Sequence, residues 1–154
     1  MKNNLYATNE RPYLKSKKHK GPTVCPECGL VFEDGIWKNI DKPKGQYNEH
    51  LCPACERIKD GYFGGILTIE TDLLKTKKDE ILSMIKNKEK SVQRSNPLRR
   101  IGKIEDVSDN KIIVYTTFEH LAVSLGKALT HAYKGDLDIQ YREGEKSAFV
   151  YWKK

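Results

Sequence analysis

The chain has 154 residues, enough for one domain or two small ones. Only 38% of the residues are hydrophobic and 32% are charged, which excludes a large hydrophobic core. A fold with a small core usually needs an additional stabilising cross-link, such as a bound metal ion. No apolar run approaches the roughly 20 residues that span a membrane, and no secretory segment is evident, so we expect a cytoplasmic protein without a membrane partner.

The formal net charge of +7 is unevenly distributed along the chain. Residues 1–24 carry six Lys/Arg and one acidic residue, and residues 75–103 carry ten and three. The remaining segments are mildly acidic. A tail and a connecting segment therefore hold the positive charge, and two interpretations stay open for the connecting segment: a solvated lysine-rich face, or a face that contacts phosphates.

Residues 1–24 have sparse apolar residues without a period, and we expect a flexible basic tail. Its basic run contains Lys15, Lys17, Lys18 and Lys20. Two interpretations stay open: a solvated tail that aids solubility, or an arm that binds phosphates and becomes ordered on contact.

The next segment contains all four cysteines of the chain, in two C-x-x-C pairs: Cys25, Cys28, Cys52 and Cys55. Two such knuckles can complete a tetrahedral Cys₄ zinc site with bonds of about 2.3 Å. An iron–sulfur centre or a redox role is the less favoured alternative. Four thiolate ligands leave no open position for catalysis, so we expect structural Zn²⁺ in a reducing compartment.

We expect residues 25–70 to form a zinc ribbon around this site. Short strands are predicted at residues 30–32 and from residue 36, joined by a turn over 33–35, with a polar loop over 41–49 and a further strand at 66–70. His50 lies two residues before Cys52 and is expected to be a bystander rather than a ligand.

Residues 71–100 are predicted to form a basic helix and linker. A helix over 72–93, capped by Thr71 or Asp72, would place one thin apolar stripe on the rest of the protein: Leu74, Ile81, Ile85 and Val92. Its other faces carry Lys75, Lys77, Lys78, Lys86, Lys88, Lys90 and Arg94. The residues predicted to contact nucleic acid are Lys15, Lys17, Lys18, Lys20, Lys75, Lys77, Lys78, Lys86, Arg99 and Arg100.

Residues 101–154 are predicted to form a ββαββ unit, an antiparallel sheet covered by one helix, so the fold class is α+β. Its strands are expected at 101–107, 112–115, 137–141 and 148–152. A capping box from Thr116 to Glu119 should open the helix, Gly126 should mark close packing on the sheet, and Gly135 should end the helix. The uncovered face would draw on Tyr115, Tyr141, Phe149, Tyr151 or Trp152, as core residues or as a base-stacking surface.

Several motifs together resemble a small family of bacterial zinc-ribbon proteins. They are Cys25-Pro-x-Cys28-Gly29, Cys52-Pro-x-Cys55, Arg57-Ile58-x-Asp60-Gly61-Tyr62, Gly65-Ile66-Leu67, His120-Leu121-Ala122, Gly126-x-Ala128-Leu129 and His131-Ala132-Tyr133-x-Gly135. The resemblance covers most of residues 22–152. That family is similar to the zinc-binding region of the Nmd export adaptor of the large ribosomal subunit, which carries more cysteine knuckles. The resemblance implies contact with ribosomal RNA or the ribosome, and nuclear export is not carried over.

The leading prediction is a zinc-dependent protein that binds ribosomal or other structured RNA, or the ribosome itself, through the RNA backbone. Lysines outnumber arginines in the basic segments, which suits phosphate contact better than base reading. The alternative is a zinc-ribbon protein–protein adaptor without nucleic-acid binding. An enzyme is disfavoured because no nucleophile–base arrangement or phosphate-binding glycine loop is found, and no small-molecule substrate is expected. A DNA-binding transcription factor is disfavoured because no recognition-helix motif appears.

Overall fold

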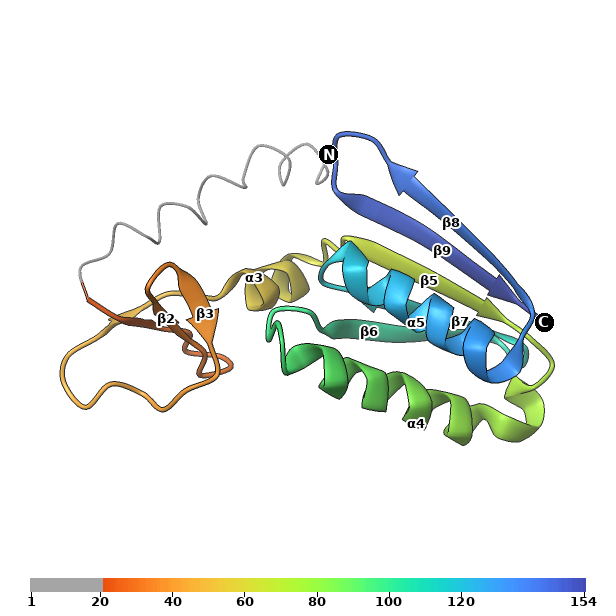
Figure 1. Cartoon of the computed structure of the whole chain (residues 1–154), viewed down its shortest axis with the longest axis horizontal. Coiled ribbons are helices and arrows are strands. Elements are labelled where there is room, and N and C mark those ends of the chain that lie inside the picture. Colours follow the sequence, from red (N-terminus) through yellow and green to blue (C-terminus); the bar gives the residue numbers. More distant parts are fainter. Residues whose placement is uncertain (1–20) are drawn as a thin grey trace. The chain divides into compact units, whose positions relative to one another are not determined.

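The computed structural model describes residues 21–154, and the chain divides into two compact units. The first ends at Tyr62 and the second runs from Phe63 to Lys154 (Figure 1). The predicted basic run of the N-terminal tail, from Lys15 to Lys20, lies outside the described residues.

From residue 21 onwards, the first unit combines a small sheet with one short helix. Its elements are β1 (Thr23–Val24), β2 (Val31–Glu33), β3 (Ile36–Lys38), β4 (Asn48–Glu49) and α3 (Pro53–Asp60). The strands lie in the order β3-β2-β1-β4. The predicted hairpin of β2 and β3 is confirmed, whereas the sequence did not predict β4 or α3.

The hairpin positions the small core of the first unit. Its two-residue turn places Asp34 at φ 56° and Gly35 at φ 83°, the left-handed conformations that a type I′ turn requires. Phe32 and Trp37 then pair across the strands, with ring centroids 5.2 Å apart. Further buried apolar side chains beside this pair are Val24, Leu30 and Val31.

The second unit contains a five-stranded sheet and two helices. In chain order its elements are β5 (Gly65–Glu70), α4 (Leu74–Gln93), β6 (Ile101–Ser108), β7 (Lys111–Thr116), α5 (Glu119–Tyr133), β8 (Asp136–Arg142) and β9 (Ser147–Lys153). The strands lie in the order β6-β7-β5-β9-β8. The strand β5 is therefore central, antiparallel to β7 and parallel to β9.

The predicted ββαββ order is present as β6, β7, α5, β8 and β9, but the predicted arrangement is wrong in two respects. The sheet is mixed rather than antiparallel, because β5, which was expected to belong to the ribbon, inserts between β7 and β9. Two helices rather than one contribute to the core, since α4 joins α5. The pairing of β5 with β9 joins segments about 80 residues apart, and parallel pairs require such long connections.

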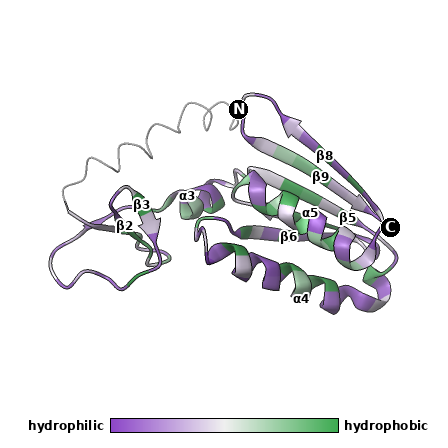
Figure 2. Ribbon diagram, viewed as in Figure 1, coloured by the Kyte–Doolittle hydropathy of each residue, from purple (hydrophilic) through white to green (hydrophobic). Residues whose placement is uncertain are grey.

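The core lies between one face of this sheet and the two helices. The sheet contributes Leu67, Ile69, Ile112, Val114, Ala148, Val150 and Trp152, all buried. The helices contribute Leu121, Leu125 and Leu129 from α5 and Leu74, Ile81 and Ile85 from α4. The predicted apolar stripe of α4 is confirmed, and hydrophilic residues cover much of the rest of this helix (Figure 2). Among the described residues, no helix is long and apolar enough to cross a membrane.

Two details of α5 test the expectations from the sequence. The predicted close packing at Gly126 is confirmed, because a Cβ there would lie 2.7 Å from Val150 Cγ1. The predicted capping box is wrong: Phe118 is the N-cap and makes no side-chain cap bond. Thr116 belongs to β7, and its hydroxyl donates to the carbonyl oxygen of Phe118 at 2.7 Å.

Candidate metal centre

The fold brings the four cysteines of the first unit together. The sulfurs of Cys25, Cys28, Cys52 and Cys55 all lie within 4.8 Å of one another, and none forms a disulfide. The Sγ atoms of Cys28 and Cys52 are 3.7 Å apart. Tetrahedral bonds of about 2.3 Å place two sulfurs about 3.8 Å apart, so the cluster has the spacing needed to hold one metal ion.

The first knuckle is a turn that follows β1. The amide of Cys25 donates to the carbonyl oxygen of Leu30, and the amide of Gly29 donates to that of Cys25, both at 2.9 Å. Gly29 adopts φ 81°, a left-handed conformation that glycine allows without steric cost. This turn brings the sulfurs of the buried Cys25 and the exposed Cys28 together in the four-cysteine cluster.

The second knuckle forms the N-terminus of α3. Cys52 is the N-cap, and its sulfur accepts from the amide of Cys55 at 3.4 Å. The positive end of the helix dipole lies there and favours thiolate over thiol. The sequence carries a signal for this helix that the prediction of a ribbon overlooked: Pro53 at the first helical position and Gly61, at φ 66°, just past the end.

Two titratable groups lie near the second knuckle. His50 is not part of the cysteine cluster in the described chain, and its Nδ1 lies 2.8 Å from the carbonyl oxygen of Leu51. Burial raises the pKa of the Glu56 carboxyl, and the nearby His50 acts in the opposite direction. Neither group is placed as a metal ligand.

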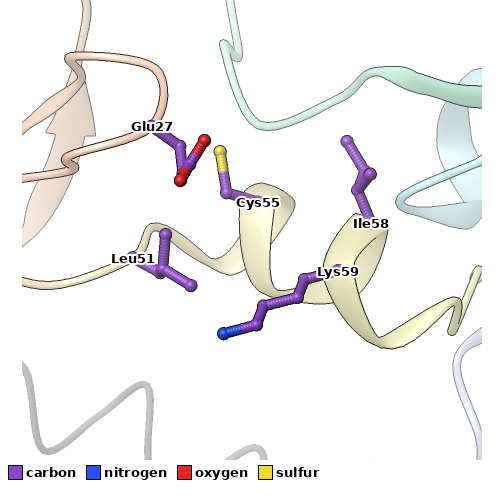
Figure 3. A pocket seen from close by; sticks show the side chains of 5 residues that line it. All are labelled: Glu27, Leu51, Cys55, Ile58 and Lys59. Carbon is purple, nitrogen blue, oxygen red and sulfur yellow. The ribbon is translucent and has the colours of Figure 1, made fainter.

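A pocket of about 400 Å³ opens beside the cluster (Figure 3). Its lining residues are Glu27 from the first knuckle, Leu51, and Cys55, Ile58 and Lys59 from α3. The sulfur of Cys55 and the exposed side chain of Cys28 therefore make the cluster accessible to small molecules in solution.

The predicted nucleic-acid contacts within α4 have different surroundings. Lys75 forms an ion pair with Asp72 at 3.4 Å, and Lys78 forms one with Asp106 at 2.6 Å. Lys77, at a kink in the helix, and Lys86 are exposed and have no ion pair within residues 21–154.

The predicted arginines lie in the segment after α4, where both are half-buried. The Arg100 side chain donates through Nε to the carbonyl oxygen of Pro97 at 3.0 Å, and its backbone amide donates to Thr117 Oγ1 at 2.9 Å. Arg100 therefore holds the segment before β6, while Arg99 lines a second pocket with His120 and Tyr141.

Three exposed cations follow one another along one side of α4 and its C-cap. Lys86, Lys90 and Arg94 are exposed and follow one another at four-residue spacing, which places them on one side of the helix. Two of the three carboxylates of α4 are instead engaged within the second unit. Glu80 accepts from the hydroxyl of Tyr133, and Glu89 accepts from the amide of Ile101.

Comparison of the chain with protein-family models, curated proteins and solved structures finds no match. The resemblance to bacterial zinc-ribbon proteins therefore stays a prediction, and the function is argued from the residues themselves.

Proposed function

We propose that this chain is a zinc-binding, non-enzymatic cytoplasmic protein that contacts the backbone of structured RNA, in the ribosome or elsewhere. The observation that carries the proposal is the line formed by Lys86 and Lys90 on α4 and by Arg94 at its C-cap, which have no ion pair within the described part of the chain. The zinc ion has a structural role in this proposal.

The choice of zinc rests on the donor set. Four thiolates in tetrahedral spacing select soft or borderline metals, and Zn²⁺ is the usual ion for two paired knuckles. A site with four protein ligands leaves no position for substrate, so the ion stabilises the fold rather than catalysing a reaction.

The choice of RNA rests on charge and geometry. Successive residues of the line are separated by about 6 Å along the helix, because each residue rises about 1.5 Å. Glu80 and Glu89 keep their negative charge, but their hydrogen bonds are to Tyr133 and Ile101, and within the described residues neither forms an ion pair with these cations. Lysine acts as a point charge towards phosphate, which supports binding by shape and charge with little base preference.

The test is fluorescence anisotropy with a labelled RNA hairpin over a range of salt concentrations. Replacing Lys86, Lys90 and Arg94 together by Gln should weaken binding and lower the salt dependence by roughly 0.7–0.9 in slope for each phosphate that the variant no longer neutralises. The matched control replaces three exposed lysines outside α4 by Gln: Lys42, Lys44 and Lys127. Affinity that does not change with salt, or an equal weakening in the control, contradicts the proposal.

Sedimentation of cell lysate tests the ribosomal form of the proposal. Migration of the protein with a ribosomal subunit at low salt, abolished at high salt and after RNase, is the expected result. RNase-resistant association with one protein would instead favour the alternative function, a protein–protein adaptor without nucleic-acid binding.

A further inference from the structure

The second unit has a sheet face that neither of its helices covers. Both α4 and α5 pack on the opposite face, where the buried core lies. On the uncovered face, every residue from the three central strands β7, β5 and β9 is half-buried or exposed. This surface, the open face, is the strongest feature of the molecule that the proposed function has not used.

Strand register places a row of five side chains across the open face. Reading from β6 to β8, the row is Lys103, Tyr115, Ile66, Phe149 and Gln140. It contains two aromatic rings, one lysine and no carboxylate. The neighbouring row is Glu105, Ile113, Thr68, Tyr151 and Asp138, and its tyrosine is 43% exposed.

The ring of Tyr115 is held in place by its neighbours. Its hydroxyl donates to Glu105 at 3.0 Å, and the ring of Phe63 lies 5.4 Å away, centroid to centroid. Phe63 packs against the backbone of Gly102, where an added Cβ would lie 2.3 Å from a ring carbon. Because these neighbours fix the ring before any ligand arrives, binding would cost little ordering of Tyr115.

Cations lie beside both rings of the row. Lys103 Nζ is 4.9 Å from the centroid of Tyr115, and Arg142 Cζ is 4.9 Å from that of Phe149. Carboxylates lie near both cations: Glu105 accepts from the Tyr115 hydroxyl beside Lys103, and Glu145 forms an ion pair with Arg142 at 3.8 Å. The row therefore combines apolar rings with the positive charge of Lys103, and a phosphate at Arg142 would replace the long, solvent-accessible ion pair that Arg142 makes with Glu145.

We propose that the open face binds an unpaired segment of RNA, with bases stacked on Tyr115 and Phe149 and phosphates placed near Lys103 and Arg142. The charge of the row complements a polyanion, and its rings match the planar faces of unpaired bases. Bases inside a duplex are already stacked and do not reach such a surface. This inference rests on the proposed RNA binding and adds the class of RNA, a single strand or loop.

The experiment compares a short single-stranded RNA with a blunt duplex of the same sequence. Phe149→Leu keeps an apolar side chain but removes the ring, and should weaken binding of the single strand about tenfold while leaving duplex binding unchanged. The matched control is Tyr47→Leu, which removes a 37%-exposed ring from the first unit. It should leave both affinities unchanged, and thermal unfolding checks that each variant is folded.

The outcomes separate this inference from the proposed function. If the wild-type protein binds RNA and Phe149→Leu binds the single strand equally well, the open-face inference is overturned and the proposed function stands. Absence of binding to either RNA by the wild-type protein overturns both. Concentration-dependent self-association that disappears in Phe149→Leu, with RNA affinity unchanged, would assign this face to a second copy of the chain and overturn the inference.

Discussion

If the cysteine cluster holds zinc as proposed, removal of this ion should unfold the first unit and leave the second unit folded. The chain's two tryptophans lie one in each unit. Trp37 is 8% exposed and packs on Phe32, whereas Trp152 is 1% exposed and donates through Nε1 to the carbonyl oxygen of Lys134. Because the two rings belong to separate cores, their fluorescence reports on the two units separately.

The expected loss of stability follows from the small core of the first unit. Few large apolar side chains are buried there besides Phe32 and Trp37. Structural zinc contributes about 10–16 kcal/mol of apparent binding free energy at pH 7. A small domain is stable by only about 5–15 kcal/mol in total. At roughly 0.05–0.15 kcal/mol per residue, a unit this small lies at the low end of that range. The free energy supplied by the proposed zinc ion is therefore larger than the stability expected without it, and the first unit should be unfolded at room temperature once the ion is removed.

The assay is tryptophan emission before and after addition of a strong chelator. Trp37→Phe isolates the signal of Trp152, and subtraction of that spectrum from the wild type gives the signal of Trp37. The Trp37 signal should shift to the red as the ring meets water, and the Trp152 signal should not move. Cys52→Ser removes one ligand of the proposed zinc site. Its emission spectrum should resemble that of the chelated wild-type protein and should not change when the chelator is added. A parallel shift of both signals, or an unchanged Trp37 signal, would refute the reasoning.

Two further predictions concern the second unit. Leu67→Ala, on the central strand β5, should lower the free energy of unfolding of this unit by about 2–5 kcal/mol because it leaves a cavity in the core. Denaturant titration followed by Trp152 emission measures this change. A loss of stability seen only in the Trp37 signal would contradict the prediction. The hydrogen bond from Tyr133 to Glu80 raises the pKa of Tyr133 to about 12, above the value of about 10 for an unfolded tyrosine. The stabilisation from this bond is therefore present below pH ~10 and disappears as the pH rises towards ~12; Tyr133→Phe should remove one late step from the tyrosinate absorbance titration, and an unchanged titration would contradict the assignment.

Local features of the chain were readable from the sequence because they depend on neighbours along it. The spacing of the four cysteines predicted a cluster, and the structure brings their sulfurs together. The apolar period over 72–93 predicted α4 and the stripe that it buries. In each case the signal is contained in a motif or a helical repeat, so no distant partner has to be known.

The errors concern pairings between distant segments. Residues 66–70 were correctly predicted to form a strand, but the sequence of a strand does not reveal which strands it pairs with. This strand was assigned to the zinc ribbon because it follows the second cysteine pair closely in the sequence. Burial of Leu67 and Ile69 between β7 and β9 makes β5 the centre of the other sheet. Because β5 is parallel to β9, its insertion makes the sheet mixed instead of the predicted antiparallel one.

The sequence by itself determined the cysteine cluster, the strands and helices of the second unit apart from their pairing, and the cationic character of α4. Each of these follows from residue type and local spacing, which fix ligand chemistry and helix faces. Only the tertiary structure decided that Glu80 and Glu89 bond within the unit, and that Tyr115 and Phe149 share an uncovered face. The physical reason is that the face on which a side chain lies depends on strand register and helix docking, and both are set by interactions between segments far apart in the chain.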